Sequence, residues 1–422
     1  MKFSSLIISV ISSALTFLLC FLIFGGHASN ASDDSQSSLR AEYNMAVESA
    51  EFVKSEPPVK DTSGYDSCDD SSVLEIPPIN KGEEIRAVWV ASVYNLNLPS
   101  ERGLSAEELA SEVDELVESS RKNNINTIIF QVRPASDALY RSEIFPSSHF
   151  LTGRQGEEIE FDILDYLLYK AHKSDISVFA WINPYRVTTA SMTLSDLSED
   201  NPAKKHPDWI YSSGGAYYYN PGIPEVTELI ADGVYELCYN YGVDGVIFDD
   251  YFYAEEIGLS DYDEYERYGG GLSLADYRRE CVNTLVKSCY ESVKSVSEDI
   301  IFGVSPRGVW RNKSEDPDGS DTLGGAAYDE IYCDSVAFIK GGYIDIISPQ
   351  IYWPFSSGVC PFGVLSDWWA DTVREYGGDK VKLVISLAAY SLSESEIDTQ
   401  KKHVKNLYSY GGYALYNASS LD

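Results

Sequence analysis

The sequence is poor in cysteine, in histidine and in positive charge, and each shortage excludes a class of protein. Its 7 cysteines include no CxxC pair, so we expect neither a zinc ribbon nor a disulfide scaffold. Buried free thiols are the favoured interpretation, and an isolated disulfide is the alternative. His149 and His206 stand alone, and the 5 histidines form no HExxH or HxH pattern. No metal and no other cofactor is therefore expected.

Basic residues are outnumbered two to one, which bears on possible partners. The 32 Lys and Arg against 66 Asp and Glu give a formal net charge of −34. Such a surface repels nucleic acid and anionic lipid head groups. We therefore expect no nucleic-acid partner, and membrane contact only through the N-terminal segment; the oligomeric state is not predicted.

Long apolar runs are absent except at the N-terminus. Lys2 precedes an apolar run over residues 6–24, with small residues following it. This pattern predicts a signal peptide over residues 1–28, although the run is also nearly long enough for an uncleaved membrane anchor. We expect a protein that is secreted or anchored to the outer face of the cytoplasmic membrane. Residues 29–80, rich in Ser, Asp, Glu and Pro, are typical of a low-complexity acidic linker.

Residues 81–422 have a different pattern, in which short apolar runs alternate with amphipathic segments of helical period. Eight segments are expected to be strands: 85–92, 127–133, 177–183, 245–251, 300–307, 344–352, 382–390 and 413–419. Seven segments between them are expected to be helices: 105–122, 161–174, 224–241, 273–297, 329–341, 366–377 and 394–410. This alternation predicts an α/β protein with a single (β/α)8 TIM barrel.

Two features qualify the barrel prediction. No GxGxxG follows the first strand, so a doubly wound sheet is only the second choice. The sequence stops directly after the eighth strand, so we expect a barrel without its last helix, in a sequence that is a fragment of a longer one.

The active site of a parallel barrel lies where the strands end and the following loops begin. Polar and aromatic residues at these ends are therefore the candidates. Those expected to bind substrate are Trp89, Gln131, Arg133, Asp137, Asn183, Tyr185, Arg186, Tyr251, Tyr253, Arg307, Trp310, Gln350, Tyr352 and Trp353.

The fourth strand supplies the candidate catalytic residues, Asp249 and Asp250. Glycoside hydrolysis needs one carboxylate to attack or stabilise an oxocarbenium-like centre, and a second carboxyl to protonate the leaving oxygen. Alternation along a regular strand lets only one of the pair point inward, and we expect this to be Asp249. Alternatively, both aspartates have a structural role as helix caps or as ion-pair partners of arginines.

The proton donor is harder to choose, because no other strand end carries a carboxyl. Five residues in the long loops after the second and fifth strands are candidates: Asp137, Glu143, Asp316, Asp318 and Asp321. Long loops of a barrel often carry function. The last three could also bind calcium, but an Asp/Gly/Ser turn gives the same pattern and is favoured.

Seven segments, taken in order, resemble a known family. They are EIRAVWVASVYNLNLPS (84–100), FQVRPASDALYRSEIFPSSHFLTGRQG (130–156), FAWINPYRV (179–187), YYNPGIPEV (218–226), DGVIFDDYFY (244–253), SPRGVWRN (305–312) and SPQIYW (348–353). Together they resemble the glycosyl hydrolase-like 10 family of bacterial cell-wall-associated barrel proteins.

The resemblance implies an exported glycoside hydrolase acting on a bacterial cell-wall glycan, such as peptidoglycan glycan strands that lack stem peptides. It covers most of the strand-end residues named above, and the Asp-Gly-x-x-x-Asp pattern of the fourth strand implies a nucleophile at Asp249. A barrel that binds glycan without cleaving it is the alternative, since no second carboxylate stands out.

Overall fold

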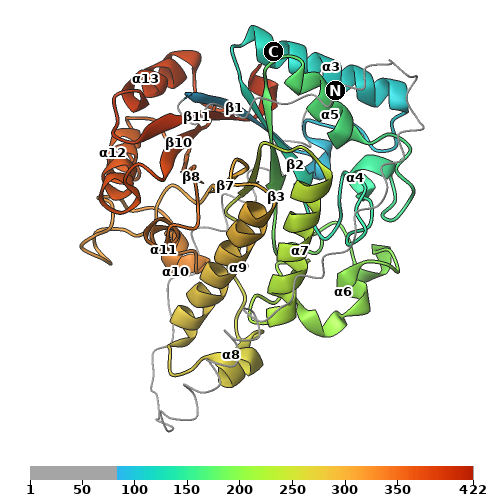
Figure 1. Ribbon diagram of the computed structural model, residues 1–422. Helices are drawn as coiled ribbons and strands as arrows, with labels where there is room; N and C mark the ends of the chain where they lie inside the picture. Colours follow the sequence, from blue (N-terminus) through green and yellow to red (C-terminus); the bar gives the residue numbers. More distant parts are fainter. Residues whose placement is uncertain (1–82, 422) are drawn as a thin grey trace, which may run out of the picture.

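The computed structural model describes residues 83–421. The expected signal segment 1–28 and the linker 29–80 lie outside these residues. Figure 1 shows a ring of strands surrounded by helices. Within the described part of the chain, no helix combines the length and the apolar character needed to cross a membrane.

The barrel strands are close to those expected from the sequence. They are β1 (Ile85–Val90), β2 (Thr127–Arg133), β3 (Ser177–Ile182), β6 (Gly245–Phe248), β7 (Ile301–Val304), β8 (Ile346–Ile347), β10 (Lys382–Leu387) and β11 (Tyr410–Tyr416). Neighbouring strands are parallel, and β11 pairs with both β10 and β1. This pairing closes the sheet, confirms the (β/α)8 barrel and excludes the doubly wound alternative.

The segment expected as one strand over 344–352 is divided. A short strand β9 (Gln350–Ile351) follows β8 and also pairs with β10. Pro349 lies between them and has no N–H to donate, so the ladder cannot run through it without a break.

Helices cover the outside of the barrel in the expected order. The principal ones are α3 (Ala106–Lys122), α5 (Ile163–His172), α7 (Pro224–Asn240), α9 (Leu274–Val296), α11 (Ser335–Gly341), α12 (Phe362–Thr372) and α13 (Glu394–Val404). Local sequence explains their starts: Ser105 and Glu108 form a capping box at α3, and Pro224 occupies the first turn of α7.

Three of the expected helices differ by more than two residues from their expected bounds. Helix α12 begins at Phe362 rather than at 366, and the turn that follows it, Val373–Gly377, is a π-helix. The segment 329–341 is broken into α10 (Ala327–Glu330) and α11, and Tyr332 between them has a φ of 54°, which a continuous helix cannot contain. Helix α13 ends at Val404 rather than at 410.

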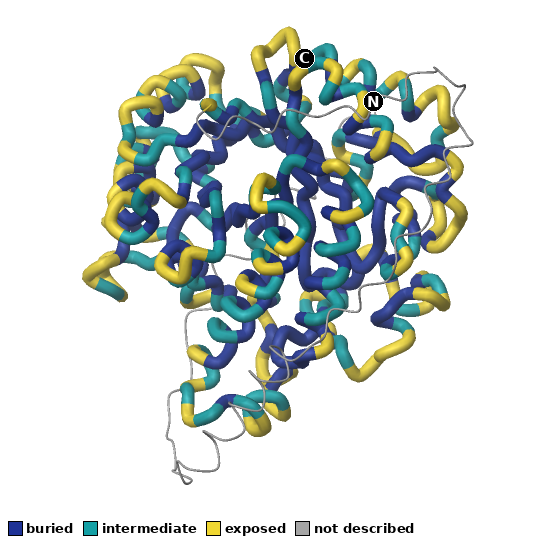
Figure 2. The backbone as a smooth tube through the Cα atoms, viewed as in Figure 1, coloured by how far each residue is buried: buried dark blue, intermediate teal, exposed yellow. Residues whose placement is uncertain are grey.

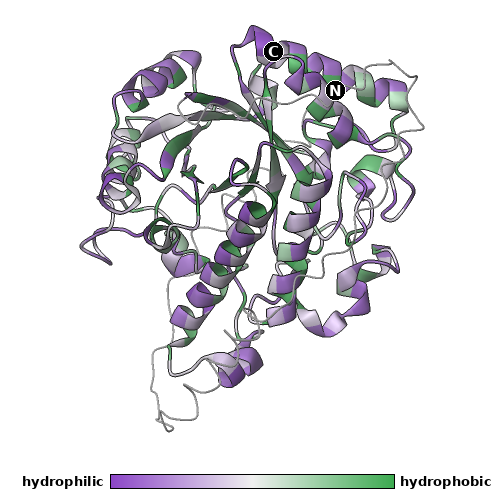
Figure 3. Ribbon diagram, in the orientation of Figure 1, coloured by the Kyte–Doolittle hydropathy of each residue, from purple (hydrophilic) through white to green (hydrophobic). Residues whose placement is uncertain are grey.

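The apolar residues form two cores on opposite faces of the strands. One fills the barrel and includes Trp89 and Trp181, whose rings meet edge to face at 5.0 Å. The other lies between the strands and the helices. Both strand faces are therefore buried, as Figure 2 shows, whereas the outer helices are hydrophilic on the solvent side, as Figure 3 shows.

Insertions at the carboxyl ends of the strands were not anticipated. The connection from β3 to α7 contains helix α6 (Pro202–Lys205) and an antiparallel hairpin, β4 (Ile210–Ser213) and β5 (Ala216–Tyr219). The backbone N–H of Tyr219 donates to the carbonyl of Tyr185, which fixes the hairpin beside the end of β3. Helix α8 (Tyr262–Tyr268) lies in the loop after β6, and helix α4 (His149–Thr152) in the loop after β2.

The cysteines of the described residues are all buried: Cys238, Cys281, Cys289, Cys333 and Cys360. The expectation of buried thiols is confirmed for these five. Cys20 and Cys68 lie outside the described residues.

Candidate active site

Asp249 follows β6 directly and is the most enclosed carboxyl at the barrel mouth. Its side chain is 2% exposed. The Trp181 Nε1–H, at 2.9 Å, and the Asn183 side-chain amide both donate to Asp249 Oδ2. The backbone N–H of Tyr251 donates to Oδ1 at 3.1 Å. These three donors fix the orientation of the carboxyl group.

The Asn183 amide is itself oriented by Gln131. Gln131 Oε1 accepts hydrogen bonds from the backbone N–H groups of Ser92 and Val93, both at 3.0 Å. Its Nε2 must therefore be the end that donates to Asn183 Oδ1, at 2.6 Å. Asn183 is consequently left with its N–H₂ facing Asp249. A chain of two amides thus connects the loop after β1 to the carboxyl.

The environment of Asp249 makes it a proton-exchanging group near neutral pH. Burial, followed by the adjacent negative charge of Asp250, raises the pKa of Asp249 to about 7, and the opposing effects of Arg186 and the hydrogen bonds are smaller. Catalytic acids and bases need pKa values near the working pH, so this carboxyl is suited to proton transfer.

Asp250 points to a different set of partners. Gln350 Nε2 donates to its Oδ1 at 2.9 Å, and Arg307 Nε lies 3.5 Å from its Oδ2. Arg307 also pairs with Glu255 at 2.5 Å and with Glu330 at 2.6 Å. One guanidinium therefore holds three carboxylates from two segments of the chain, and stabilises negative charge on Asp250.

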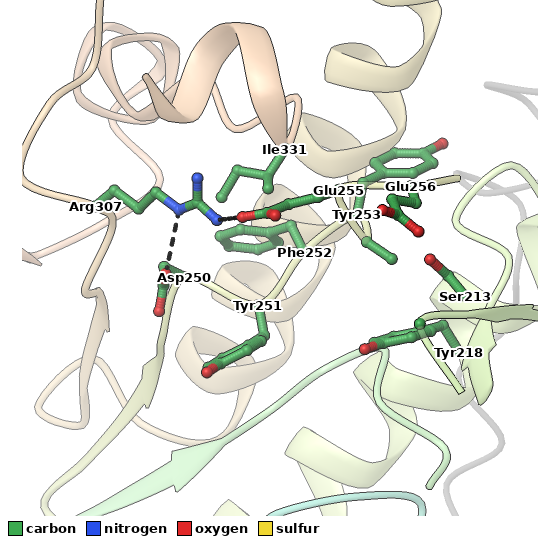
Figure 4. A pocket seen from close by; sticks show the side chains of 12 residues that line it. Ser213, Tyr218, Asp250, Tyr251, Phe252, Tyr253, Glu255, Glu256, Arg307 and Ile331 are labelled. Atoms are coloured by element: carbon green, nitrogen blue, oxygen red, sulfur yellow. Dashed lines mark hydrogen bonds and ion pairs between the residues drawn. The ribbon is translucent and has the colours of Figure 1, made fainter. Parts of the chain in front are cut away.

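A cavity of about 310 Å³ lies beside this network. As Figure 4 shows, Asp250 and Arg307 lie on one side of it and the β4–β5 hairpin lies on the other. The residues that line it are Ser213, Gly214, Tyr218, Asp250, Tyr251, Phe252, Tyr253, Ala254, Glu255, Glu256, Arg307 and Ile331. Carboxylates, one arginine and tyrosine rings are a lining that suits a polar ligand with apolar faces.

Tyrosines surround the two aspartates. Tyr251 is half exposed, and the Arg186 guanidinium lies 4.2 Å from the centre of its ring. Tyr352 packs against Tyr390 and Tyr416 with ring centres 6.3 and 5.7 Å away. Such rings can pack against the C–H face of a sugar.

Ten of the sequence-predicted site residues thus lie in the barrel interior or at its mouth: Trp89, Gln131, Asn183, Arg186, Asp249, Asp250, Tyr251, Arg307, Gln350 and Tyr352. Trp89 lies deepest, within the interior core, and its Nε1–H donates to Ser386.

Arg133 is not brought to this site. The pairing of β2 with β3 shifts register between Gln131 and Arg133, so a bulge interrupts the alternation of side chains. Arg133 faces the helices, where its guanidinium lies 3.6 Å from the centre of the Phe145 ring and borders Gly233 of α7. It is fully buried, and its three nitrogens have no hydrogen-bond partner among the described residues.

We expect Arg133→Met to retain activity within about twofold and to leave the melting temperature equal or higher. A buried cation without hydrogen bonds is costly, and an apolar side chain of similar length removes that cost. Thermal unfolding and a glycan-cleavage assay check this expectation. A tenfold loss of kcat/KM in a fully folded variant would show that Arg133 does contribute to the active site.

The other five expected residues have the following surroundings. Asp137 is buried against Gln155 and His149, and Tyr185 is buried in the core outside the strands. Trp310 stacks on Trp368 and donates to Asp334. Trp353 packs against Gly308. Tyr253 lines the cavity, but it is buried and its ring meets Tyr332 edge to face.

The five loop carboxyls considered as proton donors do not line the cavity. Asp316 accepts a hydrogen bond from the backbone N–H of Asp318 and pairs with Arg311. This arrangement matches the turn that the sequence favoured for the Asp316–Asp321 segment.

Sequence reasoning missed Trp181, Glu255 and Glu256. Trp181 precedes Asn183 by two residues on one strand, so alternation places both on the inner face. Glu255 and Glu256 follow Asp250 in the same loop, and a run of carboxyls so close to Asp249 was the available signal. Their place across the cavity from the hairpin depends on tertiary structure.

Fold and site together define a closed (β/α)8 barrel with paired carboxyl groups at the carboxyl ends of its strands. The chain belongs to the glycosyl hydrolase-like 10 family, whose model matches residues 84–405. The family expected from the sequence motifs is thereby confirmed.

Curated relatives carry hydrolase names. The chain is 41% identical over 318 residues to "Glycosyl hydrolase YngK" of Bacillus subtilis, a match that covers 74% of this chain and 62% of that protein. It is also 41% identical over 331 residues to "Glycosyl hydrolase DigH" of Escherichia coli K12, with 74% of each chain covered. The chain thus spans less than two thirds of the length of the Bacillus relative.

Among solved structures, the catalytic domain of beta-amylase from Paenibacillus polymyxa is similar with a TM-score of 0.51 and 10% identity. The match covers 80% of this chain and 94% of that one. At such low identity the similarity shows the shared fold alone.

Proposed function

We propose that this protein is an exported glycoside hydrolase that cleaves a bacterial cell-wall glycan, with peptidoglycan glycan strands that lack stem peptides as its substrate. The observation that carries the proposal is the environment of Asp249. This carboxyl is buried, accepts three hydrogen bonds, has a pKa raised to about 7 and lies beside a second carboxylate. Hydrolysis of a glycosidic bond requires such a pair, one group as acid and the other as carboxylate.

In the proposed reaction Asp249 acts as the proton donor, a role different from the nucleophile implied by the sequence pattern. Asp249 protonates the glycosidic oxygen as the bond to the anomeric carbon breaks. The negative charge of Asp250, held by Arg307 and Gln350, stabilises the positive charge that develops on that carbon. Water then adds to the carbon and returns a proton to Asp249, so the net change is addition of one water molecule across the bond.

A barrel that only binds glycan is less well supported. Burying a carboxyl beside another carboxylate costs free energy, and binding alone gives no reason to retain that cost. Glu255 and Glu256 at the cavity also supply the further carboxyl groups whose apparent absence had favoured simple binding.

The proposal is tested by incubating the purified protein with peptidoglycan glycan strands from which an amidase has removed the stem peptides. We expect mass spectrometry to detect shorter oligosaccharides, each cleavage adding the mass of one water. Asp249→Asn is the control and should release them at least about a hundredfold more slowly. If the strands remain intact after incubation with the wild-type protein but co-sediment with it, the protein is a glycan-binding barrel and the proposal of an enzyme is wrong.

A further inference from the structure

An exposed tyrosine in a strained backbone conformation stands in the loop after β1. Tyr94 belongs to the 3-10 turn η2 (Val93–Asn95) and has a φ of 57°, and Asn95 has a φ of 52°. The left-handed region is unfavourable for a residue with a bulky side chain such as tyrosine, whereas asparagine tolerates it better. The Tyr94 side chain is nevertheless 59% exposed, so burial of the ring does not offset this cost.

The loop is held in place by specific contacts. Asn95 Nδ2 donates to the carbonyls of Pro99 and Phe150, at 3.0 and 2.8 Å. Asn97 Oδ1 accepts from the backbone N–H of Ala91 at 2.9 Å. The Tyr94 ring meets Phe150 edge to face at 6.0 Å. The structure therefore presents this ring to solvent in a fixed position.

Gln131 sets that position relative to Asp249. The same side-chain oxygen that orients the amide chain toward Asp249 accepts the backbone N–H groups of Ser92 and Val93. Val93 immediately precedes Tyr94. The position of the exposed Tyr94 ring and the orientation of the buried Asp249 carboxyl thus both depend on hydrogen bonds of Gln131.

Tyrosine rings also line the cavity itself. Tyr218 lines the cavity, and its backbone bridges to Arg186, whose guanidinium covers the Tyr251 ring. The cavity therefore offers tyrosine rings of the same kind as the one that the loop after β1 exposes.

We propose that Tyr94 forms a second sugar-binding subsite, which packs against the face of an uncharged pyranose ring when the glycan is too long for the cavity alone. The inference rests on the proposed function and deepens it, since it identifies the substrate as a polymeric glycan rather than a short oligosaccharide. A phenol ring offers an apolar face for sugar C–H groups and a hydroxyl for sugar oxygens. Strain held at an exposed ring is typical of ligand-binding positions.

The test compares glycan strands fractionated by length, with kinetics and equilibrium binding measured on each fraction. We expect Tyr94→Ala to raise KM and Kd for long strands about fivefold or more, with no change for the shortest strand that binds. Tyr94→Phe should retain wild-type values within about twofold, because the ring face is kept. Tyr408→Ala is the matched control, since Tyr408 is 49% exposed on the loop before β11, at the other end of the barrel.

The outcomes separate this subsite from the proposed function. Cleavage by the wild-type protein with identical length dependence in Tyr94→Ala would overturn the subsite and leave the function standing. Equal losses on short and long strands would also overturn it. If the wild-type protein cleaves nothing, the proposed function fails, and the Kd values then decide the subsite: a loss confined to long strands supports it, and any other result overturns it.

Discussion

Asp249→Asn is expected to lower kcat on glycan strands by about a hundredfold to ten-thousandfold, the range that a general acid contributes. The substitution keeps the shape of the side chain but removes the proton that the leaving oxygen needs. Glycan binding should be largely kept, because only interactions stronger in the transition state than in the ground state affect turnover. Steady-state kinetics and binding of the same strands check both halves of this expectation.

The matched control is Asp250→Asn, which removes one negative charge from the adjacent residue. We expect Asp250→Asn to lower turnover, while its activity still falls at alkaline pH as in the wild-type protein. In Asp249→Asn this fall at alkaline pH should be absent. Equal losses in both variants, together with lowered thermal stability, would show that the pair is structural. Loss in Asp250→Asn alone would transfer the proton-donor role to that residue.

Gln131→Glu is expected to move the alkaline limb of the pH–rate profile upward by about one unit or more. The introduced carboxylate could still accept the two backbone N–H groups, but it could no longer donate to Asn183 Oδ1. Asn183 would then turn its N–H₂ toward the new carboxylate and lose its hydrogen bond to Asp249. A hydrogen bond to a charged group contributes about 1.5–3 kcal/mol, and one pKa unit corresponds to about 1.4 kcal/mol.

The sign of the shift follows from the protonation state that catalysis requires. As a proton donor Asp249 works in its protonated form, so kcat/KM falls as the pH rises through its pKa of about 7. Loss of the Asn183 hydrogen bond destabilises the ionised form and raises that pKa further, so activity persists to higher pH. Gln131→Met removes both the acceptor for the backbone N–H groups and the donor to Asn183. It shows the effect of losing the whole amide on folding and activity. An alkaline limb that stays at its wild-type pH in Gln131→Glu would contradict the proposed orientation of the amides.

Much of the fold was predictable because its signals are local. Apolar runs bounded by polar residues marked the barrel strands within a few positions, and most surrounding helices began within about two residues of the expected start. The β4–β5 hairpin was not predicted. Its strands are short, and its place beside β3 depends on backbone hydrogen bonds to residues 185–187.

The site was predictable only where strand alternation continues to the end of a strand. The strand-end argument selected Gln131 and Asn183, and both lie in the chain of hydrogen bonds that reaches Asp249. It failed at Arg133, where a single bulge turned the side chain to the helices. A bulge of one residue leaves no clear mark in this sequence, because a strand of a parallel barrel is buried on both faces and is therefore apolar along its whole length.

The barrel, the family and the first candidate carboxyl group could be predicted without a structure, since they follow from periodicity and from motifs within single segments. Tertiary structure alone decided which groups surround that carboxyl. The donors Trp181 and Asn183 lie more than sixty residues before Asp249 in the chain. Burial inside the barrel is the largest cause of the raised pKa of Asp249, and the charge of Asp250 is the next. Electrostatic effects depend on distance and solvent exposure, which sequence order does not contain.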